Sequence, residues 1–346
     1  MKNIYFMRLR KSISVIFFSF VLIAQPACGG PLDEALDALA NKIYERALKR
    51  LEPLASEGNA AAQYWLGVMY NKGQGVQQDY VKAAKWYRKA ADAGYFKAQT
   101  NLGVLYANGH GVKQDYREAV AWFLKAAAQN DAEAQHNLGM SFATGQGVTL
   151  NYETAASWFR KAAQQGFAPA QSKLGVLYEN GDGVQRDDAE AAKWYLKAAE
   201  QGDTLAEMKL GYMYDQGKGV PQDYVRAVAW LRKASAKGDA EAQAKLGFMY
   251  FGGKGVKQDP TDAATWFRKA AEQGGVPSQM ALGYMYENGL GVPKNEVQAY
   301  IWYSLAVKGG MAEAHGMLNA LGKRMSPLDI SEAQRLLRDW IASHKK

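Results

Sequence analysis

The chain has 346 residues, 48% hydrophobic and 22% charged, a composition that excludes disordered and collagen-like proteins. Its formal net charge is +8, but four of the positive charges lie among the first 27 residues, which carry no acidic side chain. The remaining +4 is spread along the chain, so we predict no nucleic-acid partner. Cys28 is the only cysteine, which excludes an internal disulfide, so we expect the fold to be held by packing alone.

The first 27 residues have the pattern of a secretory signal peptide. Basic residues precede the apolar run "ISVIFFSFVLIA" (Ile13–Ala24), and "QPACGG" follows it. The run is shorter than the roughly 20 apolar residues that a membrane-spanning helix needs. We therefore predict a signal peptide over residues 1–27 and an exported protein.

Cys28 stands where a bacterial lipoprotein carries its lipidated cysteine. Gln25 and Pro26 differ, however, from the aliphatic and small residues that usually precede such a cysteine. Lipidation of Cys28 would anchor the protein at the outer membrane. Ordinary cleavage near Ala27–Gly30 would leave it in the periplasm or secreted, and both alternatives stay open. A lipid anchor is the only membrane contact that the sequence suggests.

From residue 60 onward the chain repeats itself every 36 residues, without insertion or deletion. Leucine recurs at positions 66, 102, 138, 174, 210, 246, 282 and 318. Tryptophan keeps the same step, as Trp86, Trp122, Trp158, Trp194, Trp230, Trp266 and Trp302. A fixed period of this length indicates a solenoid of stacked units, because one unit cannot bury its apolar surface alone.

Each unit predicts two helices, roughly over residues 60–72 and 80–92 in the first repeat. Apolar residues at helical spacing mark both, and a "GxGV" turn joins them. The residue that opens the second helix is always Asp or Asn, as an N-cap requires: Asp79, Asp115, Asn151, Asp187, Asp223, Asp259 and Asn295. The residue that follows the second helix is Gly in every repeat except at Asn130, and both types tolerate a left-handed C-cap.

The repeated pattern also indicates how these helices pack. Gly67 and its equivalents have no Cβ, so we expect the second helix to approach the first closely there. The seven tryptophans then have a structural role, because each would fill the gap between neighbouring repeats. A buried aromatic side chain removes about 150–250 Å² from water, so seven of them would contribute strongly to stability.

Partial units flank the array. "YERALKRLEPLASEGN" (Tyr44–Asn59) aligns with the second helix of a repeat, so we expect N-terminal helices and a half-repeat over residues 31–59. Residues 311–346 begin with a half-repeat that aligns with the first helix. After Ser326–Pro327 they continue with an apolar stripe that predicts a capping helix: Ile330, Ala333, Leu337 and Trp340.

The repeated pattern "A-x-x-x-LG-x-x-Y-x-x-G-x-GV-x-x-D-x-x-x-A-x-x-WY-x-KAA-x-x-G" resembles the Sel-one-like repeat (SLR) of the tetratricopeptide superfamily. The resemblance covers residues 60–310 as seven units. It implies an all-α fold, a right-handed α-solenoid of helix-turn-helix repeats. It also implies that a concave groove, lined by the first helices, holds an extended peptide or a partner helix.

One face of the first helix varies between repeats. Positions 62, 63, 66, 67 and 70 stay nearly constant and share one arc, whereas positions 61, 64, 68, 71 and 72 vary and share the opposite arc.

Two features of this variable arc stand out. Position 68 becomes aromatic late in the array, as Tyr212, Phe248 and Tyr284, which indicates either packing between adjacent first helices or a docking strip. At the neighbouring position 65 the later repeats carry Asn101, Asn137, Lys173, Lys209 and Lys245, which form either a clamp for a peptide carboxylate or a solvated edge.

Catalytic motifs are missing from the sequence. The "GQGVQQ" loops lack the third glycine of a dinucleotide turn and the GK[ST] ending of a P-loop. The four histidines lack metal-ligand spacing to each other or to the cysteine. One branch of the SLR family is described as binding or hydrolysing β-lactams, but its members pair two cysteines within each repeat, and no repeat here holds any. We therefore predict no catalytic residue, no metal site, no cofactor and no enzymatic activity.

These features predict a scaffold or adaptor of the bacterial envelope that binds a protein or peptide partner in the groove as a monomer. The alternative is a cell-wall-directed protein that binds peptidoglycan fragments or processes β-lactams.

Overall fold

The computed structural model describes residues 29–344, so the expected signal peptide and Cys28 lie outside the described part of the chain. Between these limits it contains eighteen α-helices and no strand, which confirms the all-α prediction. The helices are α1 (Pro31–Ala40), α2 (Tyr44–Ser56), α3 (Ala60–Lys72), α4 (Tyr80–Asp92), α5 (Phe96–Asn108), α6 (Tyr116–Ala128), α7 (Ala132–Thr144), α8 (Tyr152–Gln164), α9 (Ala168–Asn180), α10 (Asp188–Glu200), α11 (Thr204–Gln216), α12 (Tyr224–Ala236), α13 (Ala240–Gly252), α14 (Pro260–Glu272), α15 (Val276–Asn288), α16 (Glu296–Lys308), α17 (Ala312–Gly322) and α18 (Pro327–Ser343).

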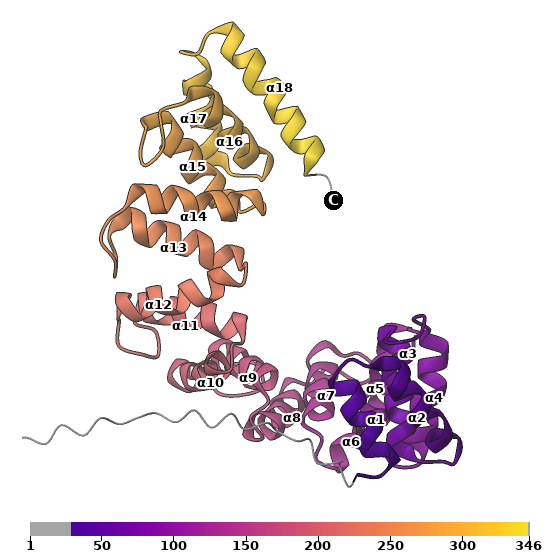
Figure 1. Cartoon of the computed structure of the whole chain (residues 1–346). Coiled ribbons are helices and arrows are strands. Elements are labelled where there is room, and N and C mark those ends of the chain that lie inside the picture. Colours follow the sequence, from indigo (N-terminus) through magenta and orange to yellow (C-terminus); the bar gives the residue numbers. More distant parts are fainter. Residues whose placement is uncertain (1–28, 345–346) are drawn as a thin grey trace, which may run out of the picture.

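Consecutive helices pack as pairs, from α3 with α4 to α15 with α16. Each second helix also packs on the first helix of the next pair. The pairs follow a curved path, and the N-terminal and C-terminal repeats form two arms of an open arc (Figure 1). The chain is therefore an α-solenoid, as the 36-residue period predicted.

The helix boundaries follow the predicted caps. The Asp79 side chain accepts a hydrogen bond from the backbone N–H of Lys82 at 2.9 Å, and the equivalent Asp or Asn caps the second helix in all seven repeats. Asn130, which follows α6, has a φ of 67° in the left-handed region. Both local predictions are confirmed.

The two helices of a repeat approach each other at the glycine of the first helix. A Cβ on Gly67 would lie 2.5 Å from Cδ1 of Tyr87 on α4, and the equivalent glycines leave only 2.5–2.8 Å. The ring at position 87 thus packs directly on the backbone of α3. Its equivalents are exposed by at most 4%: Tyr87, Phe123, Phe159, Tyr195, Leu231, Phe267 and Tyr303.

The tryptophans lie one position earlier and are less deeply buried than these residues. Trp122, Trp194 and Trp302 are buried, and the other four are half-buried. Trp122 and Trp194 belong to the apolar clusters of the repeats before their own, so they bridge neighbouring units. A lysine in the last turn of the same helix places its Nζ over the indole, from 3.7 Å at Lys125 to 4.4 Å at Lys89. This lysine column therefore covers the tryptophans, and its place in the last helical turn also suits the helix dipole.

Neighbouring repeats are also joined through the turns. A Cβ on Gly111, the second glycine of its turn, would lie 2.1 Å from the carbonyl oxygen of Tyr80 at the start of α4. The turn of one repeat therefore rests on the second helix of the repeat before it. Arg160 on α8 adds a hydrogen bond of 3.1 Å to the hydroxyl of Tyr178 on α9.

A buried amide on the first helix links consecutive repeats in a second way. Gln99 is 4% exposed, donates to the carbonyl of Ala91 at 3.1 Å, and accepts a 2.9 Å hydrogen bond from Gln129. In the fifth repeat the same two positions hold Glu207 and Lys237, whose side chains form a 2.7 Å ion pair. In this repeat an ion pair between the buried Glu207 and the more exposed Lys237 has thus replaced the pair of amides.

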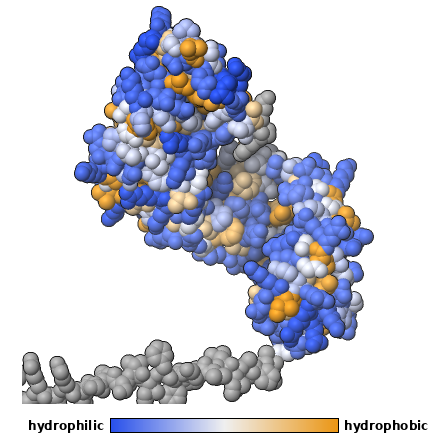
Figure 2. Space-filling view, turned by 45° about the horizontal axis from the view of Figure 1, so that its top comes forward, coloured by the Kyte–Doolittle hydropathy of each residue, from blue (hydrophilic) through white to orange (hydrophobic). Residues whose placement is uncertain are grey.

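Both ends of the array are covered by helices. α18 packs back on α16, where Trp340 meets Trp302 edge-on with ring centroids 6.0 Å apart. α1 packs on α2 at the other end. The surface in Figure 2 is mainly hydrophilic, with small scattered hydrophobic patches. Within residues 29–344, no helix combines the length and apolar character needed to cross a membrane.

Candidate functional site

A pocket of about 420 Å³ opens between α3 and α5, on the side that varies between repeats. Four of its residues occupy variable positions 64, 68, 71 and 72, and Asn101 and Val104 are their neighbours from the next repeat. The lining is Tyr64, Trp65, Val68, Asn71, Lys72, Tyr80, Tyr87, Asn101, Val104, Leu105 and His110. We call positions 61, 64, 65, 68, 71 and 72 and their equivalents the variable face.

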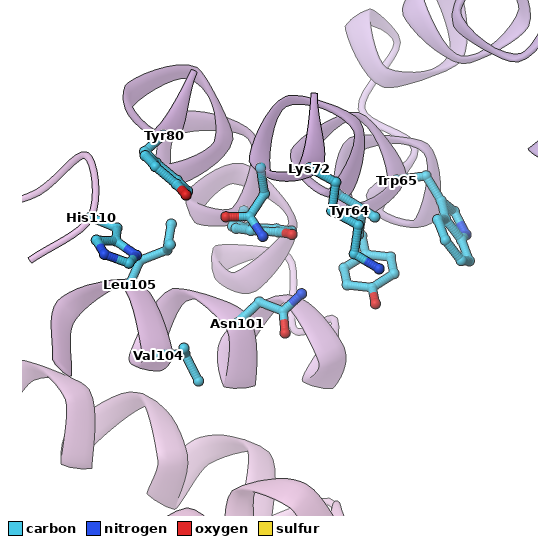
Figure 3. A pocket seen from close by; sticks show the side chains of 11 residues that line it. Tyr64, Trp65, Lys72, Tyr80, Asn101, Val104, Leu105 and His110 are labelled. Carbon is cyan, nitrogen blue, oxygen red and sulfur yellow. The ribbon is translucent and has the colours of Figure 1, made fainter. Parts of the chain in front are cut away.

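Side chains from three helices and one turn surround this pocket (Figure 3). Asn101 rises from α5 toward α3, and Trp65 stands at one end of the hollow. At the other end the ring of Tyr80 stacks on His110, with centroids 4.7 Å apart and an interplanar angle of 24°. His110 is exposed and belongs to the wall of the pocket. Lys72 is exposed and is the one lysine or arginine in the lining.

The Tyr87 hydroxyl is the most unusual group in the pocket. Tyr87 is 1% exposed, and its hydroxyl has no hydrogen-bond partner among the described residues. Burial raises its pKa, and the nearby Asn101 amide offsets this only in part. Burial likewise raises the pKa of Tyr64, whose hydroxyl also faces Asn101. A buried hydroxyl without a partner costs about 1–3 kcal/mol, so native proteins rarely retain one without a reason.

The same positions in later repeats hold ion pairs. Lys209 on α11 lies 3.1 Å from Glu179 on α9, and Lys245 on α13 pairs with Asp215 on α11. In each pair the cation occupies position 65 of one repeat and the carboxylate occupies position 71 of the repeat before. Glu287, at position 71 of the last repeat, pairs with Arg324 beyond α17.

The carboxylates also satisfy buried tyrosines. The Tyr195 hydroxyl donates to Glu179 at 2.7 Å, and the Tyr303 hydroxyl donates to Glu287 at 2.6 Å. Burial opposes the ionisation of Glu179, but hydrogen bonds from Tyr195, Lys209 and Lys218 outweigh it and hold its pKa below the ordinary value. Tyr87 is the third tyrosine at this position, and its repeat has Asn71 where the others have glutamate.

These pairs correct the interpretation of the lysines at position 65. A carboxylate clamp needs unpaired cations, and a solvated edge needs exposed ones. Lys209 and Lys245 are neither, because both are half-buried and bound to the chain's own carboxylates. Lys173 has no ion pair among the described residues, and it lies near His136. Asn137 is half-buried on α7, without a side-chain hydrogen bond in residues 29–344. Of the five position-65 residues predicted to bind a partner, Asn101 is the one that lines the pocket.

The late aromatic residues divide into two kinds. Tyr212 is half-buried, and the Nζ of Lys245 lies 5.3 Å from its ring centroid. Phe248 and Tyr284 are 46% and 41% exposed. Phe248 packs edge-on against Phe267 of its own repeat, at 4.7 Å between centroids, so its contact is not the one predicted between adjacent first helices.

The remaining polar groups to consider are those that could bind a metal ion and those with a shifted pKa. Within residues 29–344, no three His, Cys, Asp or Glu side chains are arranged to hold a metal ion. His136 is the most perturbed histidine, lying between Phe159 and Phe167 with centroids 5.4 Å away in both cases. Burial, followed by the charge of Lys173, lowers its pKa to about 4.

Sequence reasoning missed Trp65 and Tyr80, and it named Tyr64 and Asn71 only through the variable positions 64 and 71. The signal was available, since Tyr64 and Trp65 replace the smaller or polar residues that most other repeats carry at these positions. The variability of position 71 was predicted. The hydrogen bond that its side chain accepts from a tyrosine sixteen residues later becomes apparent only when the two helices are packed together.

Comparison with protein families gives one match. The model described as "Sel1 repeat" matches seven consecutive stretches of 36 residues: 60–95, 96–131, 132–167, 168–203, 204–239, 240–275 and 276–311. A comparison with curated proteins gives no match.

Two solved structures extend this similarity. An SLR-fold protective antigen present in uropathogenic Escherichia coli strains is 30% identical, with 91% of each chain covered and a TM-score of 0.53. A Sel1 repeat protein from Oxalobacter formigenes is 34% identical, with 70% of this chain and 97% of that chain covered and a TM-score of 0.63.

Proposed function

The chain belongs to the Sel1 repeat family, and from this premise we propose that it is a non-enzymatic scaffold of the bacterial envelope, binding a protein or peptide on its variable face. Sel1 repeat proteins generally act as scaffolds in protein–protein interactions. The envelope setting rests on the expected signal peptide and on the resemblance to bacterial SLR proteins.

One observation carries the choice of the variable face. The constant positions of each repeat are used for packing, whereas the variable positions 64, 68, 71 and 72 of the first repeat line a pocket. In a solenoid whose repeats share one fold, side chains that differ between repeats are the ones able to distinguish partners. Phe248 and Tyr284 extend this face with exposed aromatic rings toward the C-terminal arm.

Affinity capture from the envelope fraction tests the proposal. The Tyr64→Ala/Asn101→Ala variant alters the variable face, and the matched Lys85→Ala/Asp92→Ala variant alters exposed positions on α4. We expect the first variant to lose a partner that wild type and the α4 variant retain. Loss from the α4 variant alone would place the partner on the opposite surface. Hydrolysis of penicillin by the purified protein would favour the cell-wall alternative.

A further inference from the structure

The pocket between α3 and α5 corresponds to a location that the later repeats fill with their own side chains. Three repeats carry tyrosine on the second helix at the position of Tyr87. In two of them the hydroxyl donates to a glutamate at position 71, namely Glu179 or Glu287. The first repeat has Asn71 instead, and the Tyr87 hydroxyl lacks an acceptor among the described residues.

The missing group is an acceptor oxygen close to Tyr87. In the fourth repeat the corresponding oxygen belongs to Glu179 and also receives Lys209 from the next repeat. Next to the first repeat, the residue at the place of Lys209 is Asn101 of the second repeat, so both the anion and the cation have been replaced by neutral amides. The pocket therefore retains the hydrogen-bonding geometry of the ion pair without its charges.

The neutral lining selects the chemistry of the ligand. A carboxylate placed against Tyr87 would be partly removed from water without a buried cation to compensate it, since Lys72 is exposed at the rim. A primary amide would suit the lining better, because its oxygen can accept from Tyr87 while its NH₂ group donates to an asparagine oxygen. The chain itself forms such amide pairs, as between Gln129 and Gln99 at 2.9 Å.

We propose that this pocket binds an uncharged side-chain amide, glutamine or asparagine, of the peptide partner, with Tyr87, Asn71 and Asn101 as its hydrogen-bonding groups. The aromatic rings of Tyr64 and Tyr80 enclose the aliphatic part of that side chain. This assignment rests on the proposed function and names the residue type that the variable face recognises in its first two repeats.

Binding of small probes to the full protein tests the assignment. N-acetylglutamine methylamide, its glutamate analogue and N-acetylglucosamine are titrated separately, and the backbone amide NMR signals of Val104 and His110 report binding. We expect the glutamine probe to bind about tenfold more tightly than the glutamate probe, the factor that 1.4 kcal/mol of charge desolvation would produce. Equal or tighter binding of the glutamate probe, or tighter binding of the sugar, would overturn the assignment.

Two variants separate recognition from folding. Asn71→Glu/Asn101→Lys rebuilds the closed pair of the fourth repeat, so we expect a higher melting temperature and no binding of the glutamine probe. Tyr87→Phe removes the hydroxyl that lacks a partner, and we expect unchanged or greater stability with several-fold weaker binding. If both variants bind the probe like wild type, or no probe shifts the signals, the assignment is wrong. If no probe binds but the Tyr64→Ala/Asn101→Ala variant still loses the captured partner, this assignment fails and the proposed function stands.

Discussion

The N-terminal and C-terminal repeats use the same positions of the variable face in opposite ways. Between α9 and α13, carboxylates at position 71 pair with lysines at position 65 of the next repeat, and one of them, Glu179, also accepts from the buried Tyr195 hydroxyl. Between α3 and α5, the equivalent residues are Asn71 and Asn101, and Tyr87 has no partner within residues 29–344. We call the region from α9 to α13 the closed arm, because internal ion pairs fill these positions. We call the region from α3 to α5 the open arm, because it leaves a pocket there.

This difference shows how a repeat array acquires a local site. The packing positions cannot change without disturbing two neighbouring units, because Gly67 and Tyr87 and their equivalents are in direct contact. Positions 65 and 71 are less constrained, since either an ion pair or two amides can be accommodated. Substitutions at these positions therefore convert structural pairs into binding groups while the solenoid is preserved.

The largest expected effect concerns the ion pair of the fifth repeat, in which the buried Glu207 carboxylate binds the exposed Lys237 side chain. Replacing Lys237 by Ala leaves the Glu207 carboxylate, 2% exposed, without its cation. We expect the free energy of unfolding to fall by about 3 kcal/mol, measured by urea denaturation. The Glu207→Gln/Lys237→Gln variant copies the amide pairs of the other repeats, and it should recover most of this loss. A double variant as unstable as the single one would contradict the equivalence of the two pairs.

Removal of Glu179 tests the closed arm directly. Glu179→Ala leaves the Tyr195 hydroxyl buried without an acceptor and releases Lys209 and Lys218, so we expect a loss of about 2 kcal/mol. The matched Asn71→Ala variant in the open arm should cost less than about 0.5 kcal/mol, because Tyr87 already lacks a partner. Similar losses in the two variants, measured by the same denaturation, would remove the distinction between the arms.

His136 lies in the third repeat, between the open and closed parts, and makes stability depend on pH. Its pKa is about 4 in the folded protein and about 6.5 when unfolded, so the unfolded chain binds the proton first as the pH falls. The folded protein should therefore lose stability between pH 6.5 and pH 4. Allowing for solvent screening at this half-buried ring, we expect wild type to lose about 1 kcal/mol more than His136→Gln between pH 7 and pH 5. Parallel pH profiles of the two proteins would contradict this.

The smallest expected effect is a gain in the first repeat. Gln63 has an Oε1 atom without a partner among the described residues, and Ala93 occupies the position from which Gln129 reaches Gln99 in the next repeat. Ala93→Gln should supply the missing donor and stabilise the protein by about 0.5–1 kcal/mol. The melting temperature measures this gain, and no increase would show that the first repeat does not tolerate the amide pair.

The sequence alone was sufficient for the architecture. The caps at Asp79 and its equivalents, the close approach at Gly67 and the paired helices all follow from local rules that apply seven times in one chain. Repetition made these predictions secure, because an accidental pattern would not recur at one spacing.

The candidate site could be predicted only in outline. The variable positions were identified correctly as a face, but the roles of single residues depend on contacts between repeats. Lys209 meets Glu179 thirty positions earlier, and the pairing becomes apparent only when the first helices are stacked. The residue after each tryptophan lies on the same apolar stripe of the second helix, and helical periodicity could not show that it is buried more deeply than the tryptophan.

The central claim is that the open arm, not the closed one, holds the partner. The most direct measurement compares affinity capture by Asn71→Glu/Asn101→Lys, which closes the first site, with capture by Glu179→Asn/Lys209→Asn, which opens the fourth. Both variants should remain folded by circular dichroism, and we predict that the first loses the partner while the second retains it. Retention by the first variant together with loss by the second would contradict the account.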